Sequence, residues 1–106
     1  MKYNKNISQL YKAILSLKNE DESRRFFRDL LTEPEIKEFA SRWQVANMLE
    51  NNINYDIITK KTGMSSTTIA RISKWLNKGY GGYKLMIKRL NEEKNNHHNT
   101  TNMAVF

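Results

Sequence analysis

The chain has 106 residues, with 18 Lys or Arg against 11 Asp or Glu, and it has no cysteine. This length allows one domain with a modest core, which dimerisation would help to bury. The lack of cysteine excludes disulfides and thiolate metal sites. No signal peptide or membrane span is visible in the sequence, so we expect a cytoplasmic protein. One proline and four glycines favour an all-α chain, because sheets joined by tight turns need more of both.

Positive charge is concentrated in one part of the chain. Between Ile57 and Asn91 there are eight basic and no acidic residues, whereas the remainder has ten basic and eleven acidic residues. The whole formal net charge of +7 therefore lies on this segment, which we call the basic segment. Its cations are Lys60, Lys61, Arg71, Lys74, Lys78, Lys84, Lys88 and Arg89. A positive field of this kind attracts nucleic acid.

Apolar residues at helical spacing predict three helices before the basic segment. The first is expected over about residues 6–18, and the second follows an acidic break and ends near Leu31. Thr32-Glu-Pro-Glu35 predicts the start of the third, because the Thr32 hydroxyl can accept from the Glu35 N–H while the carboxylate reaches back. The third helix should run to about Glu50. Its expected apolar stripe is Ile36, Phe39, Ala40, Trp43, Ala46 and Leu49.

Two short helices joined by a glycine turn are predicted over about residues 55–77, which is the pattern of a helix-turn-helix. Gly63 falls at the turn, where a left-handed conformation is needed. Ile58, Ile69 and Ile72 fall where the inner contacts of such a motif should lie. The second of these helices, capped by Ser65 or Ser66, would then dock through one side and leave its other side exposed.

The exposed side of this helix is expected to contact DNA. Short hydroxyl side chains allow close approach to a groove, lysines attract phosphates, and Arg71 is suited to a bidentate contact with guanine. The candidate DNA-binding residues are Lys60, Lys61, Ser65, Ser66, Thr67, Thr68, Ala70, Arg71, Lys74 and Lys78. The alternative interpretation is a polar, solvated helix face without a ligand.

A joint at 79–82 leads to a last helix that should end near residue 93, so the expected helical domain is 1–93. The Asn-rich segment 94–106 is expected to be disordered. His97 and His98 within it are adjacent and cannot share one helix face as metal ligands, which leaves no metal site. Trp43 and Trp75 are expected in the core or at a dimer contact. No catalytic constellation is visible, so we predict no enzymatic activity.

The sequence resembles a known family in three stretches. They are Leu30-Leu-Thr-Glu-Pro-Glu-Ile-Lys-Glu-Phe-Ala-Ser-Arg-Trp43, Thr68-Ile-Ala-Arg-Ile-Ser-Lys-Trp-Leu-Asn77 and Leu76-Asn-Lys-Gly-Tyr-Gly-Gly-Tyr83. The first two resemble the Trp repressor superfamily, and the third is similar to its TrpR-like YerC/YecD branch. The resemblance implies an all-α, six-helix, Trp-repressor-like fold. It also implies N-terminal helices that interlock with a second copy, and a homodimer that binds a palindromic operator.

The resemblance also raises the question of a tryptophan corepressor. In the tryptophan-sensing repressor the corepressor lies between the third and fifth helices, and two arginines clamp it. Arg42 and Arg71 match these positions, and Thr32 matches a threonine of the pocket. Positions that hold glycine and serine there are Ile72 and Trp75 here, and such large side chains disfavour L-tryptophan. We therefore expect no cofactor; the alternative role of the arginines is a phosphate contact or an ion pair with acidic residues of the third helix.

The residues and the resemblance together predict a homodimeric, sequence-specific DNA-binding transcription regulator, most simply a repressor. Three alternatives remain open from the sequence. They are a small helical dimer that binds a protein partner, a binder of structured RNA, and a tryptophan-responsive repressor.

Overall fold

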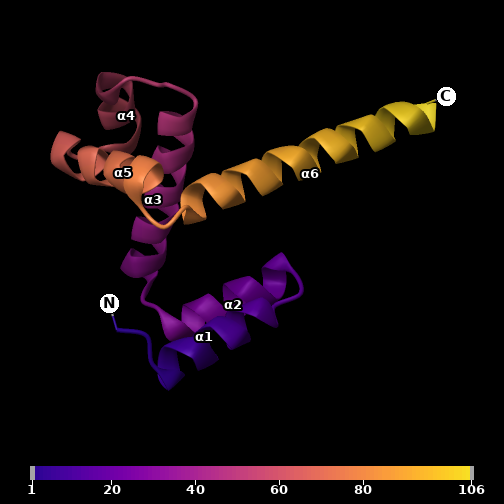
Figure 1. Cartoon of the computed structure of the whole chain (residues 1–106), viewed down its shortest axis with the longest axis horizontal. Helices are drawn as coiled ribbons and strands as arrows, with labels where there is room; N and C mark the ends of the chain where they lie inside the picture. Colours follow the sequence, from indigo (N-terminus) through magenta and orange to yellow (C-terminus); the bar gives the residue numbers. More distant parts are fainter. Residues whose placement is uncertain (1, 106) are drawn as a thin grey trace. The chain divides into compact units, whose positions relative to one another are not determined.

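The computed structural model describes residues 2–105, with side chains described for residues 2–96. These residues form six α-helices and no strand, which confirms the predicted all-α class (Figure 1). The helices are α1 (Lys5–Leu15), α2 (Glu20–Leu30), α3 (Glu33–Glu50), α4 (Tyr55–Thr62), α5 (Ser66–Lys78) and α6 (Gly82–Val105). The chain divides between Phe39 and Ala40 into two compact units, which we call the N-terminal and C-terminal units.

Side-chain caps define where the helices of the N-terminal unit begin. The side-chain oxygen of Asn4 accepts from the Ile7 N–H at 2.9 Å, and that of Asn19 accepts from the Glu22 N–H at 2.8 Å. Each cap satisfies one of the backbone donors that the first turn of a helix leaves unpaired. The first turn of α2 is also acidic, which the helix dipole favours.

The predicted capping box at the start of α3 is confirmed. The Glu35 N–H donates to Thr32 Oγ1 at 3.3 Å, and the Thr32 N–H donates to Glu35 Oε1 at 2.9 Å. The Thr32 hydroxyl also donates to the same carboxylate oxygen at 2.8 Å. These hydrogen bonds, that of the Thr32 backbone N–H first, hold the pKa of Glu35 below its ordinary value of 4.5 because they stabilise the charged form.

The N-terminal unit has no core of its own. No side chain described between residues 2 and 39 is fully buried, although many are apolar. Leu15, for example, is 83% exposed and Leu30 is 47% exposed. The other apolar side chains of these helices are at best half-buried: Ile7, Leu10, Ile14, Leu17, Phe26, Phe27, Leu31 and Ile36. The apolar surface of this unit therefore remains accessible in the single chain.

The core of the molecule lies in the C-terminal unit. Residues from α3, α4 and α5 meet there without contact with solvent, and Leu49, Ile53, Met64 and Tyr83 pack against them. The buried cluster is Val45, Ala46, Met48, Ile58, Ile69 and Ile72. Three helices thus share one small apolar core.

The predicted apolar stripe of α3 is partly wrong. Ala46 is buried as expected, but Phe39 is 50% exposed and Trp43 is only half-buried. Val45 and Met48 are buried in their place. The reason is that the shared core contacts only the C-terminal part of α3, and it covers the arc of the helix that carries residues 45, 46 and 48.

The last helix is longer than the sequence predicted. The backbone of α6 is helical to Val105, whereas the expected end was near Glu93. No glycine or proline follows Gly82, so nothing in the sequence forces an earlier end. An isolated helical segment is marginal in water, and the disorder expected over 94–106 stays a prediction. The side chains of His97 and His98 lie outside the described residues, and so does the interpretation made of them.

Candidate nucleic-acid interface

The turn between α4 and α5 has the geometry that the glycine predicted. Gly63 has a φ of 71°, in the left-handed region, and its N–H donates to the Thr59 carbonyl at 2.8 Å. The Thr62 hydroxyl accepts from the Met64 N–H at 3.2 Å and donates to the Ile58 carbonyl at 2.7 Å. A side chain at position 63 would meet no atom within 4 Å. Glycine is therefore required here by backbone conformation and not by lack of space.

One face of α5 is anchored in the core. Ile69 and Ile72 are fully buried against Ile58 of α4, and Leu76 is 4% exposed one turn further on. These positions recur at the spacing of a single helix face. They fix which side of α5 points inward, and the two isoleucines agree with the inner contacts predicted from the sequence.

The opposite face of α5 is open to solvent in the single chain. Ser66, Thr67, Ala70, Arg71 and Lys74 are all exposed. They lie on one side of a helix whose other side is held by the core. The structure thus brings together the five residues expected to enter a DNA groove.

The lysines expected to contact phosphates lie near the ends of the two helices. Lys60 and Lys61 occupy the last turn of α4, and Lys78 occupies the last turn of α5. All three are exposed. Cations at helix C-termini are favourable with the helix dipole, so these positions cost little to the fold.

Ser65 and Thr68 have a structural task that the sequence only partly indicated. Ser65 is the N-cap of α5, and its hydroxyl oxygen accepts from the Thr68 N–H at 3.3 Å. The two hydroxyls also lie 3.0 Å apart and share a hydrogen bond. Thr68 is half-buried. Both side chains are therefore engaged in capping α5, which leaves Ser66 and Thr67 as the hydroxyls exposed without this engagement.

A shallow hollow runs along the C-terminal part of the exposed face. It has a volume of about 310 Å³ and is lined by Ala70, Ser73, Lys74, Asn77 and Lys78. The Asn77 amide donates to the Ser73 carbonyl at 2.9 Å, which fixes one side of the hollow. Two lysines at its edge make it a suitable place for an anionic group such as a phosphate.

The basic segment keeps most of its charge unpaired. Among residues 2–96, Lys84 forms an ion pair with Glu50, at 2.8 Å between Nζ and Oε1. Within the same described side chains no ion pair involves Arg71, Lys74 or Lys78. The positive field of the outward face of α5 is thus not neutralised from within the chain.

The residues that the resemblance assigned to a corepressor pocket have other engagements. Thr32 belongs to the capping box in the N-terminal unit. Arg42 is half-buried on α3, and Arg71 is exposed on α5. Ile72 is fully buried in the core, whereas Trp75 is 45% exposed. Ile72 therefore fills space behind α5, while Trp75 points to a different hollow.

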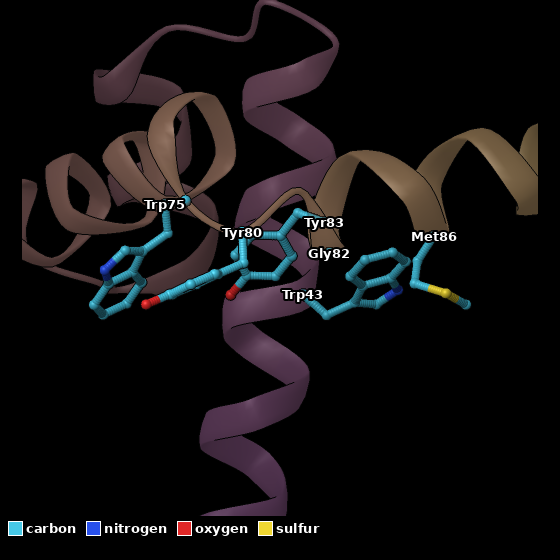
Figure 2. A pocket seen from close by; sticks show the side chains of 7 residues that line it. Trp43, Trp75, Tyr80, Gly82, Tyr83 and Met86 are labelled. Atoms are coloured by element: carbon cyan, nitrogen blue, oxygen red, sulfur yellow. The ribbon is translucent and has the colours of Figure 1, made fainter. Parts of the chain in front are cut away.

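That hollow was missed by the sequence analysis. It has a volume of about 500 Å³ and its lining includes four aromatic side chains, in a row from Trp75 through Tyr80 and Tyr83 to Trp43 in Figure 2. We call it the aromatic pocket, lined by Trp43, Trp75, Gly79, Tyr80, Gly82, Tyr83 and Met86. The signal that could have indicated it is the Gly-Tyr-Gly-Gly-Tyr joint that begins four residues after Trp75.

Two searches over the described part of the chain gave negative results. No group of three or more His, Cys, Asp or Glu side chains among residues 2–96 is placed to hold a metal ion. In the same way, no helix described here is both long and apolar enough to cross a bilayer.

The helix-turn-helix and its surroundings can now be compared with known proteins. The sequence pattern of the family described as Trp repressor protein matches residues 5–91. The chain belongs to the Trp repressor family. The protein YerC of Bacillus subtilis strain 168 is 42% identical to it over 88 residues, which are 83% of this chain and 85% of YerC. This family is one of DNA-binding regulators and not of enzymes.

Solved structures agree with this assignment. A TrpR-like protein from Eubacterium eligens ATCC 27750 shares 42% identity and a TM-score of 0.81, over 83% of this chain and 91% of that chain. A candidate Trp repressor from Staphylococcus aureus shares 35% identity and a TM-score of 0.80, over 84% of this chain and 89% of that chain. The predicted Trp-repressor-like fold and the resemblance to the TrpR-like YerC family are confirmed.

Proposed function

We propose that this protein is a sequence-specific transcription regulator, acting in the cytoplasm as a repressor, that binds a palindromic operator as a homodimer through α5. The observation that carries the proposal is the division of α5 into two faces. Ile69 and Ile72 are fully buried, while Ser66, Thr67 and Arg71 are exposed within a segment that has no acidic residue. Membership of a family of DNA-binding regulators supports the same reading.

The exposed face suggests a division of roles. Lys60, Lys61, Lys74 and Lys78 would attract phosphates, which gives affinity without sequence preference. Ser66, Thr67, Ala70 and Arg71 would face base edges in the major groove. Of these, only Arg71 offers the two parallel donors that match the O6 and N7 acceptors of guanine.

The N-terminal unit supports the proposed homodimer. Its helices carry strong apolar faces but no fully buried side chain among residues 2–39. Apolar surface of this extent stabilises a fold only when something covers it. A second copy that packs through the same unit would supply that cover by symmetry. The two α5 helices would then enter successive major grooves roughly 34–36 Å apart.

Salt dependence tests the phosphate contacts. If four to six phosphates are neutralised per dimer, the logarithm of the affinity should fall with the logarithm of salt concentration with a slope of roughly −4 to −5. Fluorescence anisotropy with labelled duplexes, between about 50 and 300 mM salt, measures this slope. A profile that does not change with salt would contradict the proposed interface.

Two substitutions separate readout from attraction. Arg71→Ala should weaken operator binding by about 1–3 kcal/mol and relax the preference at one base pair. Lys74→Ala should weaken all sequences alike and reduce the salt slope by about one. Lys12→Ala, an exposed lysine in the last turn of α1, is the matched control and should leave both quantities unchanged. If Arg71→Ala and Lys74→Ala lost affinity equally on every duplex, the assigned roles would be wrong.

The same assay distinguishes the other classes of function. The probes are random duplex DNA, duplexes from the promoter region of its own gene, and structured RNA. Preference for a short palindrome supports regulation, and preference for the RNA would transfer the basic face to another ligand. Absence of nucleic-acid binding at low salt would favour a helical adaptor that binds an acidic protein partner.

A further inference from the structure

The aromatic pocket lies outside the set of residues proposed to contact DNA. It is formed by α3, α5, α6 and the joint between the last two helices, all within the C-terminal unit (Figure 2). Neither Arg42 nor Arg71 lines it, and Thr32 belongs to the other unit. It is therefore a different place from the corepressor site that the resemblance implies.

The walls of the pocket suit a flat ring. The rings of Trp43 and Tyr83 stack, with centroids 6.2 Å apart and an angle of 26° between their planes. Trp75 is 45% exposed, and the side chain of Tyr80 is fully exposed, so both leave ring surface in contact with water. Covering aromatic faces with another ring in an offset stack is more favourable than covering them with saturated chains of the same area.

The glycines of the joint keep the pocket open. A Cβ atom at Gly79 would collide with the carbonyl oxygen of Trp75, so no side chain can be placed at this position without moving the backbone. Gly82 likewise brings no side chain into the pocket. The resulting volume of about 500 Å³ lies within the range of roughly 300–1,000 Å³ found for small-molecule sites.

Charge determines which flat rings are suitable. Aromatic cages usually attract cations, because the faces of the rings are electron-rich. Here most of the pocket belongs to the basic segment, in which Lys74, Lys78 and Lys84 lie close in sequence to the lining residues and no acidic residue occurs. This field opposes a cation and favours an anion. The uncharged walls hold the ring, and the charge of the ligand remains at the solvent side.

We propose that the aromatic pocket binds a small planar aromatic anion. A ligand in this place contacts α3, α5 and α6 together, and so it restrains the joint that follows the DNA-facing helix. Its effect on DNA affinity rests on the proposed function. The binding itself does not, because it can be measured on the protein alone.

Calorimetry of the full chain without DNA tests the binding with three probes. They are 2-naphthoate, which is flat and anionic, cyclohexanecarboxylate, which is anionic but not flat, and N-methylquinolinium, which is flat but cationic. We expect saturable binding of one 2-naphthoate per chain, and affinities at least about tenfold weaker for the other two. Both tryptophans of the chain line the pocket, so their fluorescence should change with the same midpoint.

Substitutions locate the site. Tyr80→Ala should weaken 2-naphthoate binding roughly two- to twelvefold, the loss expected for one aromatic pair. Because Tyr80 is fully exposed, its thermal unfolding temperature should stay that of the unsubstituted protein. Tyr11→Ala removes an exposed tyrosine from the N-terminal unit and is the matched control, with no expected loss of binding.

Several results would overturn the proposal. Equal affinity for the three probes would mean non-specific adsorption, and full binding by Tyr80→Ala would place the probe elsewhere. Binding that appears only at protein concentrations low enough to separate two copies would mean that a second copy covers the pocket. If L-tryptophan bound tightly and lost affinity with Arg71→Ala but not with Tyr80→Ala, the corepressor site would be in use instead. None of these outcomes depends on whether the protein binds an operator.

Discussion

Two neighbouring isoleucines of α4 offer a test of how α5 is held in place. Ile58 is fully buried against Ile69 and Ile72, whereas Ile57, one residue earlier, is 42% exposed. Replacing Ile58 by alanine removes a complete side chain from the core and leaves a cavity, at a cost of about 3 kcal/mol within a range of about 2–5 kcal/mol. The same replacement at Ile57 removes a side chain that is already partly solvated.

The matched replacement separates packing from helix propensity. Alanine is the better helix former by several tenths of a kcal/mol at either position, so this gain cancels in the comparison. We expect a net loss of about 0.5 kcal/mol for Ile57→Ala, as for most changes at partly exposed positions. At about 4–8 °C per kcal/mol, Ile58→Ala should lower the unfolding temperature by about 12–24 °C, and Ile57→Ala by about 2–4 °C.

Thermal unfolding followed by circular dichroism measures both values. The three proteins must be compared at one concentration, because the stability of a dimer depends on it. Ile58→Ala should also weaken binding to duplex DNA near its unfolding temperature, since α5 loses its anchor. Equal losses for the two variants, or an Ile58→Ala protein as stable as the unsubstituted one, would refute the assignment of Ile58 to the anchor of α5.

Three further predictions concern local features. Gly63→Ala should cost about 1 kcal/mol in unfolding experiments, because position 63 has a φ of 71°, whereas Gly82→Ala should be nearly neutral because the added Cβ meets no atom within 4 Å. Ser65→Ala should cost about 1 kcal/mol through loss of the cap of α5, and Ser65→Asp should restore it. Glu35→Gln should destabilise the protein above pH 4.5, and its difference from the unsubstituted protein should vanish as pH falls through the lowered pKa of Glu35. The sign follows because a carboxylate whose pKa is depressed by Thr32 contributes stability only while it is ionised. A difference that grew on acidification would mean that the capping box has been misassigned.

The sequence predicted the helix starts and the turn because their causes are local. A threonine and a glutamate three residues apart make the capping box of α3 whatever packs against it. A glycine after a short helix adopts the left-handed conformation at Gly63 for the same reason. The inward face of α5 was also predictable, because Ile69 and Ile72 are apolar and the residues between them are polar or small.

The buried arc of α3 was not predictable in the same way. This helix is apolar over much of its circumference, so its sequence alone does not decide which arc is covered. The decision comes from α4 and α5, whose Ile58 and Ile69 meet Val45 and Met48 and leave Phe39 exposed. The length of α6 has a different cause, since a segment without glycine or proline carries no local signal for its end.

The aromatic pocket shows the same limit of local reasoning. Trp43, Trp75 and Tyr83 come from three helices, and each lies on an apolar stripe that favours a core position. Only the turn of the chain at the glycine joint, where Gly79 packs on the carbonyl of Trp75, brings their rings to one hollow. Sequence spacing could not have distinguished this arrangement from burial.

The two units differ in what they require from a second copy. The C-terminal unit encloses its own core, so the outward position of Arg71 on α5 is already determined in a single chain. The N-terminal unit encloses none among its described side chains, and under the proposed homodimer its stability comes from the partner. A substitution that weakens the contact between copies, such as Leu15→Asp, should therefore leave α5 intact and keep half-site affinity. It should abolish the extra affinity gained when two half-sites bind together, which points to spacing between half-sites, and not to reshaping of the reading helix, as the quantity that dimerisation controls.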